Sequence, residues 1–168
     1  MPTPEFILDL RRHIGSASLW LSGASLLVVR EGSIGPEVLL CRRADDGEWS
    51  AISGIVEPGE NPAETVVREA WEEACVEVEV DRMLWLDAMD EVTFPNGDRC
   101  RFLDHGFRGR LVGGEPGIGD GEISDVGWFP AGRLPAPRQA RLAAQVRICL
   151  DDPRDVVLGL EPVSYTHL

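Results

Sequence analysis

The chain has 168 residues, of which 43% are hydrophobic and 27% charged, so we expect one globular domain of ordinary size. All 16 basic residues are arginine, which excludes Schiff-base chemistry through a lysine. The 29 acidic residues leave a formal charge of -13, which argues against a nucleic-acid partner held by a basic face. It does not exclude an anionic substrate that a divalent cation neutralises locally.

The N-terminus lacks the pattern of a signal peptide, because Glu5 and Asp9 stand where a basic start and an apolar run would be needed. No apolar stretch approaches the roughly 18 residues of a membrane span. The four cysteines are widely spaced and form no CxxC pair, so reduced thiols are expected. These features predict a cytoplasmic protein with no membrane partner.

The pattern of apolar and turn residues predicts alternating helices and strands along the chain. Turn residues 31–36 predict a hairpin between the first two strands, and the segment 113–121 predicts a glycine-rich loop. The expected elements are a helix over 5–14, strands over 19–30, 37–43, 76–88, 100–111 and 126–129, and helices over 61–75 and 137–150.

Strands and helices mixed in this way indicate an α+β or α/β sandwich with mostly antiparallel hairpin connections. We expect residues 1–16 to form an N-terminal helical extension and residues 17–160 to form a single domain. Residues 161–168 fit no pattern and are expected to be a disordered tail.

The most informative segment is Gly54 to Val76, which reads GIVEPGENPAETVVREAWEEACV. Asn61-Pro62-Ala63-Glu64 is a capping box with proline at the first helical position, so a helix begins there. On this helix Glu69, Glu72 and Glu73 share one face. Clustered carboxylates repel one another unless a hard cation such as magnesium or manganese neutralises them. The alternative is a solvated acidic face.

This segment resembles the Nudix box, whose pattern is G-x5-E-x7-R-E-U-x-E-E-x-G-U with U aliphatic. The residues in register are Gly54, Glu60, Arg68, Glu69, Ala70, Glu72, Glu73 and Val76. One residue departs from the pattern, Cys75, which stands where glycine favours a positive φ at the helix end. We interpret Cys75 as a tolerated variant that removes no ligand.

The resemblance implies a Nudix fold, a mixed β-sheet sandwiched between α-helices. It also implies a divalent-metal-dependent hydrolase acting on a nucleoside diphosphate linked to another moiety, with Mg2+ or Mn2+ as cofactor and a small nucleotide as substrate. The sequence leaves open whether the protein forms a homodimer. The implied metal ligands are the side chains of Glu69, Glu72 and Glu73, the carbonyl of Gly54 and, through water, Glu60.

The same resemblance implies three catalytic candidates. Arg68 would orient the glutamates, Glu73 would act at the metal, and Glu122, six residues before Trp128, would be the general base that activates water. A glutamate of the box remains the alternative base, and an ordinary exposed acid is the alternative interpretation of Glu122.

Three further residues are candidates for substrate binding, with solvated or structural roles as the alternative. Arg42 and Arg43 end a strand before a turn and are within reach of a phosphate, and Asp104 lies in the strand expected over 100–111. The candidate substrates are a nucleoside triphosphate and a nucleotide sugar such as ADP-ribose.

Two other functions stay open. One is a non-catalytic nucleotide-sensing module of the same fold. The other is an enzyme like isopentenyl diphosphate isomerase, whose proton transfer needs a cysteine and a glutamate flanking the substrate, with Cys41 and Cys100 available.

Overall fold

The computed structural model describes residues 3–94 and 96–160, so the expected tail at 161–168 lies outside the described residues. The elements in chain order are α1 (Glu5–Ile14), β1 (Leu19–Gly32), β2 (Gly35–Arg43), β3 (Trp49–Ser50), β4 (Ile52–Ile55), α2 (Pro62–Ala74), β5 (Val76–Ala88), β6 (Val92–Thr93), β7 (Arg99–Gly114), β8 (Ile123–Pro130), α3 (Leu142–Asp151) and β9 (Val157–Leu158). In this part of the chain no helix is long and apolar enough to cross a membrane.

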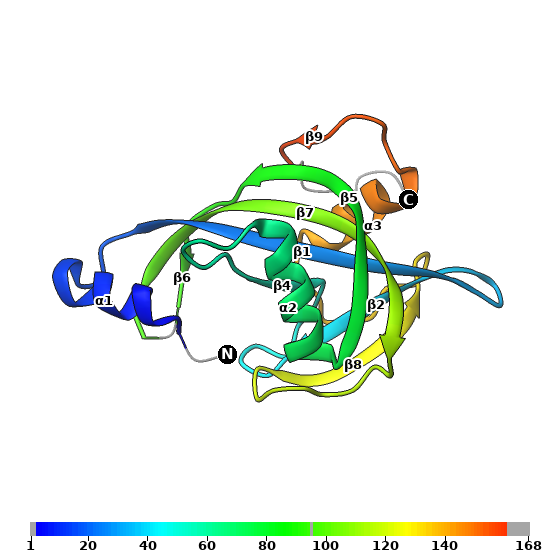
Figure 1. The fold of residues 1–168 in the computed structure, drawn as a ribbon, viewed down its shortest axis with the longest axis horizontal. Coiled ribbons are helices and arrows are strands. Elements are labelled where there is room, and N and C mark those ends of the chain that lie inside the picture. The colour runs from blue at the N-terminus through cyan, green and yellow to red at the C-terminus, as the bar shows by residue number, and fades with distance from the viewer. Residues whose placement is uncertain (1–2, 95, 161–168) are drawn as a thin grey trace.

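The strands form one mixed sheet in the order β3-β2-β1-β7-β5-β9, with β4 paired to β1, β6 to β7 and β8 to β2. The predicted hairpin of β1 and β2 is confirmed, and its turn is tight because Gly32 lies opposite Gly35. At the centre of the sheet β1 runs parallel to β7, which the pattern of hairpin connections did not predict. Figure 1 shows these two long strands side by side through the middle of the molecule.

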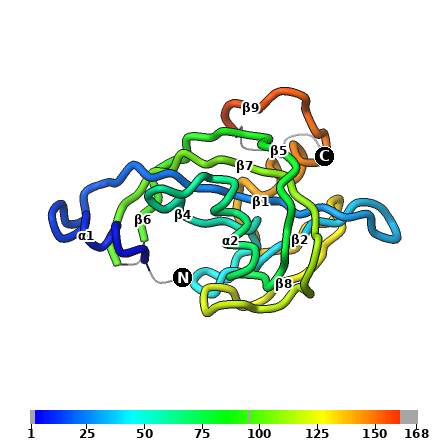
Figure 2. Tube along the Cα trace, viewed as in Figure 1, coloured from blue at the N-terminus to red at the C-terminus, as the bar shows by residue number. Residues whose placement is uncertain are grey.

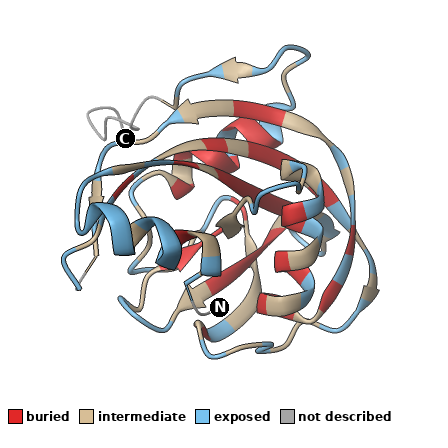
Figure 3. Cartoon of the chain, turned by 60° about the vertical axis from the view of Figure 1, so that its left-hand side comes forward, coloured by how far each residue is buried: buried red, intermediate tan, exposed pale blue. Residues whose placement is uncertain are grey.

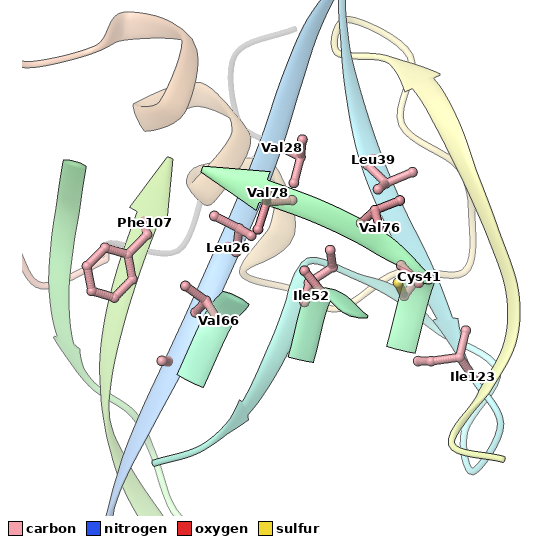
Figure 4. Close-up of a cluster of buried hydrophobic side chains, with 13 residues drawn as sticks. Leu26, Val28, Leu39, Cys41, Ile52, Val66, Val76, Val78, Phe107 and Ile123 are labelled. Carbon is pink, nitrogen blue, oxygen red and sulfur yellow. The ribbon is translucent and has the colours of Figure 1, made fainter. Parts of the chain in front are cut away.

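Two hydrophobic clusters lie on opposite faces of the sheet, because successive side chains of a strand point to opposite sides. On β1, Leu26 and Val28 belong to the cluster beneath α2, which Figure 4 shows. Leu27 belongs to the cluster beneath α3. The sheet is therefore covered by a helix on each face, as expected. The helices contribute Val66, Ala70 and Ala74 from α2 and Leu142, Val146 and Cys149 from α3.

The N-terminal helix α1 packs against one end of the sheet. Ile7 is buried beside Leu21 of β1 and Cys100 of β7 in a third hydrophobic cluster. Arg11 donates a hydrogen bond to the carbonyl of Arg99 at 2.8 Å. Figure 2 shows the α1 tube beside the β6–β7 end of the sheet. The expected extension therefore shares a core with the strands of the domain.

The last helix begins later than predicted. The alanine and leucine spacing predicted a helix from Pro137, but α3 starts at Leu142. The preceding backbone bonds to Trp49 instead, whose N–H donates to the Pro137 carbonyl at 2.9 Å and whose carbonyl accepts from Gln139 N–H at 3.0 Å. These contacts hold 137–139 extended along β3, and a local pattern does not reveal them.

Candidate active site

A cleft of about 760 Å³ runs along the end of the sheet between α2 and α1. Five of the residues singled out from the sequence line it: Gly54, Glu69, Glu122, Arg43 and Asp104. Hydrophobic side chains of α1, β1, β6 and β7 line its other part, including Ile7, Leu21, Val92 and Phe102. The cleft therefore joins an acidic end to an apolar end.

Helix α2 positions the carboxylates and forms as its sequence predicts. Asn61 is its N-cap, and the Asn61 N–H donates to the Glu64 side chain at 2.9 Å. The helix ends at Cys75, which adopts a left-handed conformation with φ 57° and ψ 30°. The backbone thus takes at Cys75 the shape that glycine favours, at a cost of about 1 to 2 kcal/mol for a residue with a Cβ atom.

Arg68 holds three carboxylates together. Its Nε donates to Glu60 Oε1 at 2.9 Å, and its NH1 group donates to Glu69 Oε1 at 2.7 Å and to Glu72 Oε2 at 3.0 Å. Glu60 also accepts from the Thr65 hydroxyl at 2.7 Å. The hydrogen bonds from Arg68 and Thr65 lower the pKa of Glu60 to about 2. These contacts agree with an orienting role for Arg68.

Glu69 and Glu73 differ from Glu72 in their surroundings. Both are only 4% exposed, whereas the Glu72 side chain is 35% exposed. Burial raises the pKa of Glu69 to about 7, although Arg68 opposes this rise. Burial and the nearby charge of Glu69 raise the pKa of Glu73 to about 8. The alternative of a solvated acidic face is therefore wrong for Glu69 and Glu73, because the sheet covers these two side chains and leaves Glu72 partly exposed.

The apolar contact of α2 with the sheet is narrow. Val66, Ala70 and Ala74 are buried, and Figure 3 shows buried and exposed residues alternating along the helices. Val67, the neighbour of Val66, is 41% exposed. The helix thus contacts the sheet through a stripe that includes Glu69 and Glu73.

Strand β4 brings backbone groups to the two buried glutamates. The Ser53 N–H donates to Glu73 Oε2 at 3.3 Å. A Cβ atom built at Gly54 would lie 1.9 Å from Glu69 Oε1, so only glycine lets the strand approach this carboxylate. The first glycine of the box motif is therefore required by the close contact between β4 and α2.

The glycine-rich segment between β7 and β8 closes over the end of α2. The Gly117 N–H donates to the Ala74 carbonyl at 3.0 Å, and the Gly119 N–H donates to the Glu73 carbonyl at 3.1 Å. These bonds satisfy carbonyls that a helix end leaves without an intrahelical partner. The docking of this segment brings Glu122, at its end, to the cleft.

The candidate base Glu122 is half-buried and lies just before β8. Its carbonyl accepts a hydrogen bond from Ala44 N–H at 2.7 Å, and its N–H donates to Asp120 Oδ1 at 3.0 Å. Both backbone groups are thus held while the residue lines the same cleft as Glu69. This placement agrees with a base that faces the substrate.

The two candidate arginines at the end of β2 lie differently. Arg43 lines the cleft and donates to both carboxylate oxygens of Asp45, at 2.9 and 2.7 Å. The Nε of Arg42 donates to the Gly47 carbonyl at 2.9 Å, and Arg42 does not line the cleft. Of the pair, Arg43 is therefore the one placed to meet a ligand.

Asp104 is buried and saturated with hydrogen bonds. Its Oδ1 accepts from the Ser25 hydroxyl at 2.7 Å. Its Oδ2 accepts from Trp85 Nε1 at 2.8 Å and from Arg141 NH2 at 2.6 Å. Asp104 therefore supports Arg141, which also lines the cleft. Arg141 carries no local sequence signal for this role, because 36 residues, including the strand β8, separate it from Asp104.

The acidic end of the cleft offers carboxylate and backbone oxygens, the donor types that a hard divalent cation takes. Among the described residues no group of three or more His, Cys, Asp or Glu side chains is arranged around a common point for a metal, and Arg68 instead holds Glu69 and Glu72. However, the raised pKa values of Glu69 and Glu73 show that burial opposes their charged forms. Carboxylate oxygens next to a close-approaching glycine backbone are the ligands that magnesium and manganese take.

Comparisons with known proteins agree on one family. A family model described as NUDIX domain matches residues 21–148. The NAD-capped RNA hydrolase NudC of Chromobacterium violaceum is 34% identical over 140 residues, which cover 81% of this chain and 49% of that protein. The chain thus spans about half the length of this relative.

Solved structures show the same fold. The crystal structure of an ADP-ribose pyrophosphatase from Streptococcus suis matches with a TM-score of 0.63 and 22% identity, covering 84% of this chain and 98% of the other. A NUDIX hydrolase from Nitrosomonas europaea matches with a TM-score of 0.63 and 22% identity, covering 83% and 77%. The expected mixed sheet between helices is confirmed by these structures.

Proposed function

Because the chain belongs to the Nudix family, we propose that it hydrolyses the pyrophosphate linkage of a nucleoside diphosphate joined to another moiety, with Mg2+ or Mn2+ as cofactor. The observation that carries the proposal is a pair of buried carboxylates beside β4: Glu69 lies against Gly54 and lines the cleft, and Glu73 accepts a hydrogen bond from Ser53 N–H. A solvated acidic surface would leave these side chains exposed. Their burial supports the proposal that a bound cation completes the site.

We assign a separate role in hydrolysis to each residue of the site. Glu69 and Glu73, with the Gly54 carbonyl, would hold the cation, which supplies charge neutralisation and polarisation of the phosphate oxygens when bound. Arg68 keeps Glu69 and Glu72 in place through short hydrogen bonds. Glu122 would accept the proton of the attacking water.

Glu60 would act indirectly, by holding the guanidinium of Arg68 in position. Both of its oxygens are engaged, Oε1 by Arg68 and Oε2 by Thr65 and Arg68. Its lowered pKa keeps it ionised, so it anchors the guanidinium. Contact between Glu60 and the cation would pass through water, as the resemblance implies.

The substrate class is a nucleoside triphosphate or a nucleotide sugar such as ADP-ribose. One relative is named an NAD-capped RNA hydrolase, and one protein of similar structure is named an ADP-ribose pyrophosphatase. This chain spans only about half of the former, so NAD and NAD-capped RNA belong in the test panel. The acidity of the chain favours the small molecules. Four free thiols agree with a cytoplasmic location.

The test is phosphate or nucleotide release from nucleoside triphosphates, ADP-ribose, NAD and NAD-capped RNA, with magnesium, with manganese and with excess chelator. We expect release that requires the added cation and falls to background in Glu73→Gln. Full activity in chelator would overturn the metal-dependent mechanism. Binding of nucleotides without hydrolysis under any condition would instead support the nucleotide-sensing module.

The isomerase alternative finds little support in the cysteines. Cys41 is fully buried, and burial raises the pKa of its thiol well above the usual value. Cys100 lines the cleft, but its sulfur lies 3.4 Å from Arg11 NH2 under α1. Conversion of isopentenyl diphosphate to its isomer, measured beside the panel above, tests this alternative directly.

A further inference from the structure

Gln145 of α3 is a buried polar side chain whose amide has no hydrogen-bond partner among the described residues. The residue is 2% exposed and lines the cleft. Across residues 3–94 and 96–160 no hydrogen bond reaches its side-chain amide. In the same residues, the fully buried side-chain atoms that lack a hydrogen-bond partner are the Nε atoms of Arg11 and Arg141. The Gln145 amide atoms are not among these fully enclosed atoms, so they open to the cleft and take their hydrogen bonds from water or from a molecule bound there.

The wall around Gln145 suits an uncharged group. Arg141 lies one helical turn before it, since the Gln145 N–H donates to the Arg141 carbonyl at 3.0 Å. The Arg141 guanidinium bonds Asp104 at 2.6 Å and Asp87 at 3.2 Å. Two carboxylates thus face one guanidinium. A phosphate at this wall would meet excess negative charge, whereas an uncharged polar ring would not.

The donor and acceptor of the Gln145 amide limit further which chemical group can bind beside it. A glutamine amide presents one acceptor and one donor side by side, and this pair matches the adjacent donor and acceptor on the edge of a nucleobase, most directly the amino group and ring nitrogen of adenine. Gln145, Glu69 and Gly54 line the same cleft, so one ligand can place a base at Gln145 and its phosphates at the carboxylates.

We propose that Gln145 is a specificity-determining residue that hydrogen-bonds the edge of the substrate's nucleobase, with Asp104 as the positioning residue that holds Arg141 beside it. The proposal rests on the proposed function, because it names the part of a nucleotide that this end of the cleft takes. It assigns the phosphates to the carboxylates of α2.

The test variant is Gln145→Met, which keeps the length of the side chain and removes both hydrogen-bonding atoms. The matched control is Arg147→Met, on the exposed side of the same helix. KM and kcat are measured with magnesium for ATP, GTP, CTP, UTP and ADP-ribose. We expect the KM for the preferred base to rise about tenfold in Gln145→Met, the ranking of the bases to flatten, and kcat to change by less than about threefold. Arg147→Met should behave as wild type.

A second measurement does not depend on hydrolysis. Adenosine, guanosine, cytidine and uridine, which carry no phosphate, are titrated into wild type and Gln145→Met in chelator, and binding is followed by ligand-observed NMR. We expect saturation of wild type by the preferred nucleoside and loss of that signal in the variant. If wild type hydrolyses nothing in the panel, the proposed function fails, while nucleoside binding through Gln145 still decides this inference.

Melting of the free protein separates a ligand contact from a structural role. Because the amide has no described partner, Gln145→Met should melt at or above the wild-type temperature. A lower melting temperature together with an unchanged base ranking would show that Gln145 bonds an internal water, and would overturn the inference. Gln145→Glu, which retains the shape but replaces the donor by an acceptor, covers the case in which the methionine variant does not fold, and it should also abolish the base preference.

Discussion

The raised pKa of Glu73 predicts an unusual dependence of stability on pH in the metal-free protein. Burial, and then the charge of Glu69, raise this pKa from 4.5 to about 8. A carboxyl whose pKa is higher in the folded state contributes stability that is fully present below pH 4.5 and is lost as pH rises toward 8. We therefore expect the metal-free protein to lose stability between pH 5 and pH 8, where proteins are often most stable.

The magnitude follows from the same pKa. A rise of this size, at about 1.4 kcal/mol for each pH unit, corresponds to roughly 5 kcal/mol at most. For a urea m-value of about 2 to 3 kcal/mol/M, this loss would lower the unfolding midpoint by about 2 M. Glu73→Gln, which is neutral at every pH, should lose much less stability over this range.

The assay is urea unfolding in excess chelator at pH 5, 6, 7, 8 and 9. Wild type is compared with Glu73→Gln and with Glu77→Gln, which removes a carboxylate at an exposed position of β5. General repulsion in this acidic chain affects all three proteins alike, so the difference between the two variants isolates the buried group. If wild type and Glu73→Gln show the same pH dependence, the reasoning about the buried carboxylate is wrong.

Four further outcomes are expected. Magnesium at a hundredfold excess over its Kd should raise the wild-type Tm by about 5 to 10 °C and the Glu73→Gln Tm by clearly less; equal shifts would place the metal elsewhere. Glu122→Gln should lower kcat by about 10² or more with a near-normal Tm, and an unchanged kcat would assign the base to a glutamate of α2. Arg68→Ala should lower the free energy of unfolding, measured with denaturant, by about 2 to 4 kcal/mol, because the carboxylates around Arg68 lose their shared hydrogen-bond donor. The surface variant Arg147→Ala should lower it much less, and similar losses in both variants would contradict a stabilising network around Arg68. Cys75→Gly should raise stability by about 0.5 to 1 kcal/mol by relieving a positive φ, and a lower urea midpoint would show that the side chain contributes more than the strain costs.

Arg43 is the candidate for binding a phosphate of the substrate at the acidic end of the cleft. It lines the cleft on the acidic side, yet both of its donors to Asp45 are used. Asp45 thus engages two of the five N–H groups of this guanidinium. Its role in substrate binding stays a prediction, and Arg42, directed to the Gly47 carbonyl, is the weaker of the two candidates.

Local patterns in the sequence were sufficient for most of the elements and for the motif. The capping box at Asn61 predicted the start of α2, and the spacing of Glu69, Glu72 and Glu73 predicted that one helix carries them. Capping and helical periodicity involve neighbours within a few residues, so one segment contains all the information they need. The same holds for the hairpin of β1 and β2, whose turn lies between its strands.

Only the tertiary structure decided which carboxylates are buried and what surrounds them. Glu69 and Glu72 look alike in the sequence, but β4 covers Glu69 through the close approach of Gly54 and leaves Glu72 beside Arg68 in partial solvent. The parallel pairing of β1 with β7 and the contact of Asp104 with Arg141 likewise join segments far apart in the chain. Burial sets the pKa of a carboxyl by removing water, and removal of water depends on every segment that packs around it. The sequence by itself therefore determined the helix and its acids, and the packing of distant strands determined which of those acids are held without water.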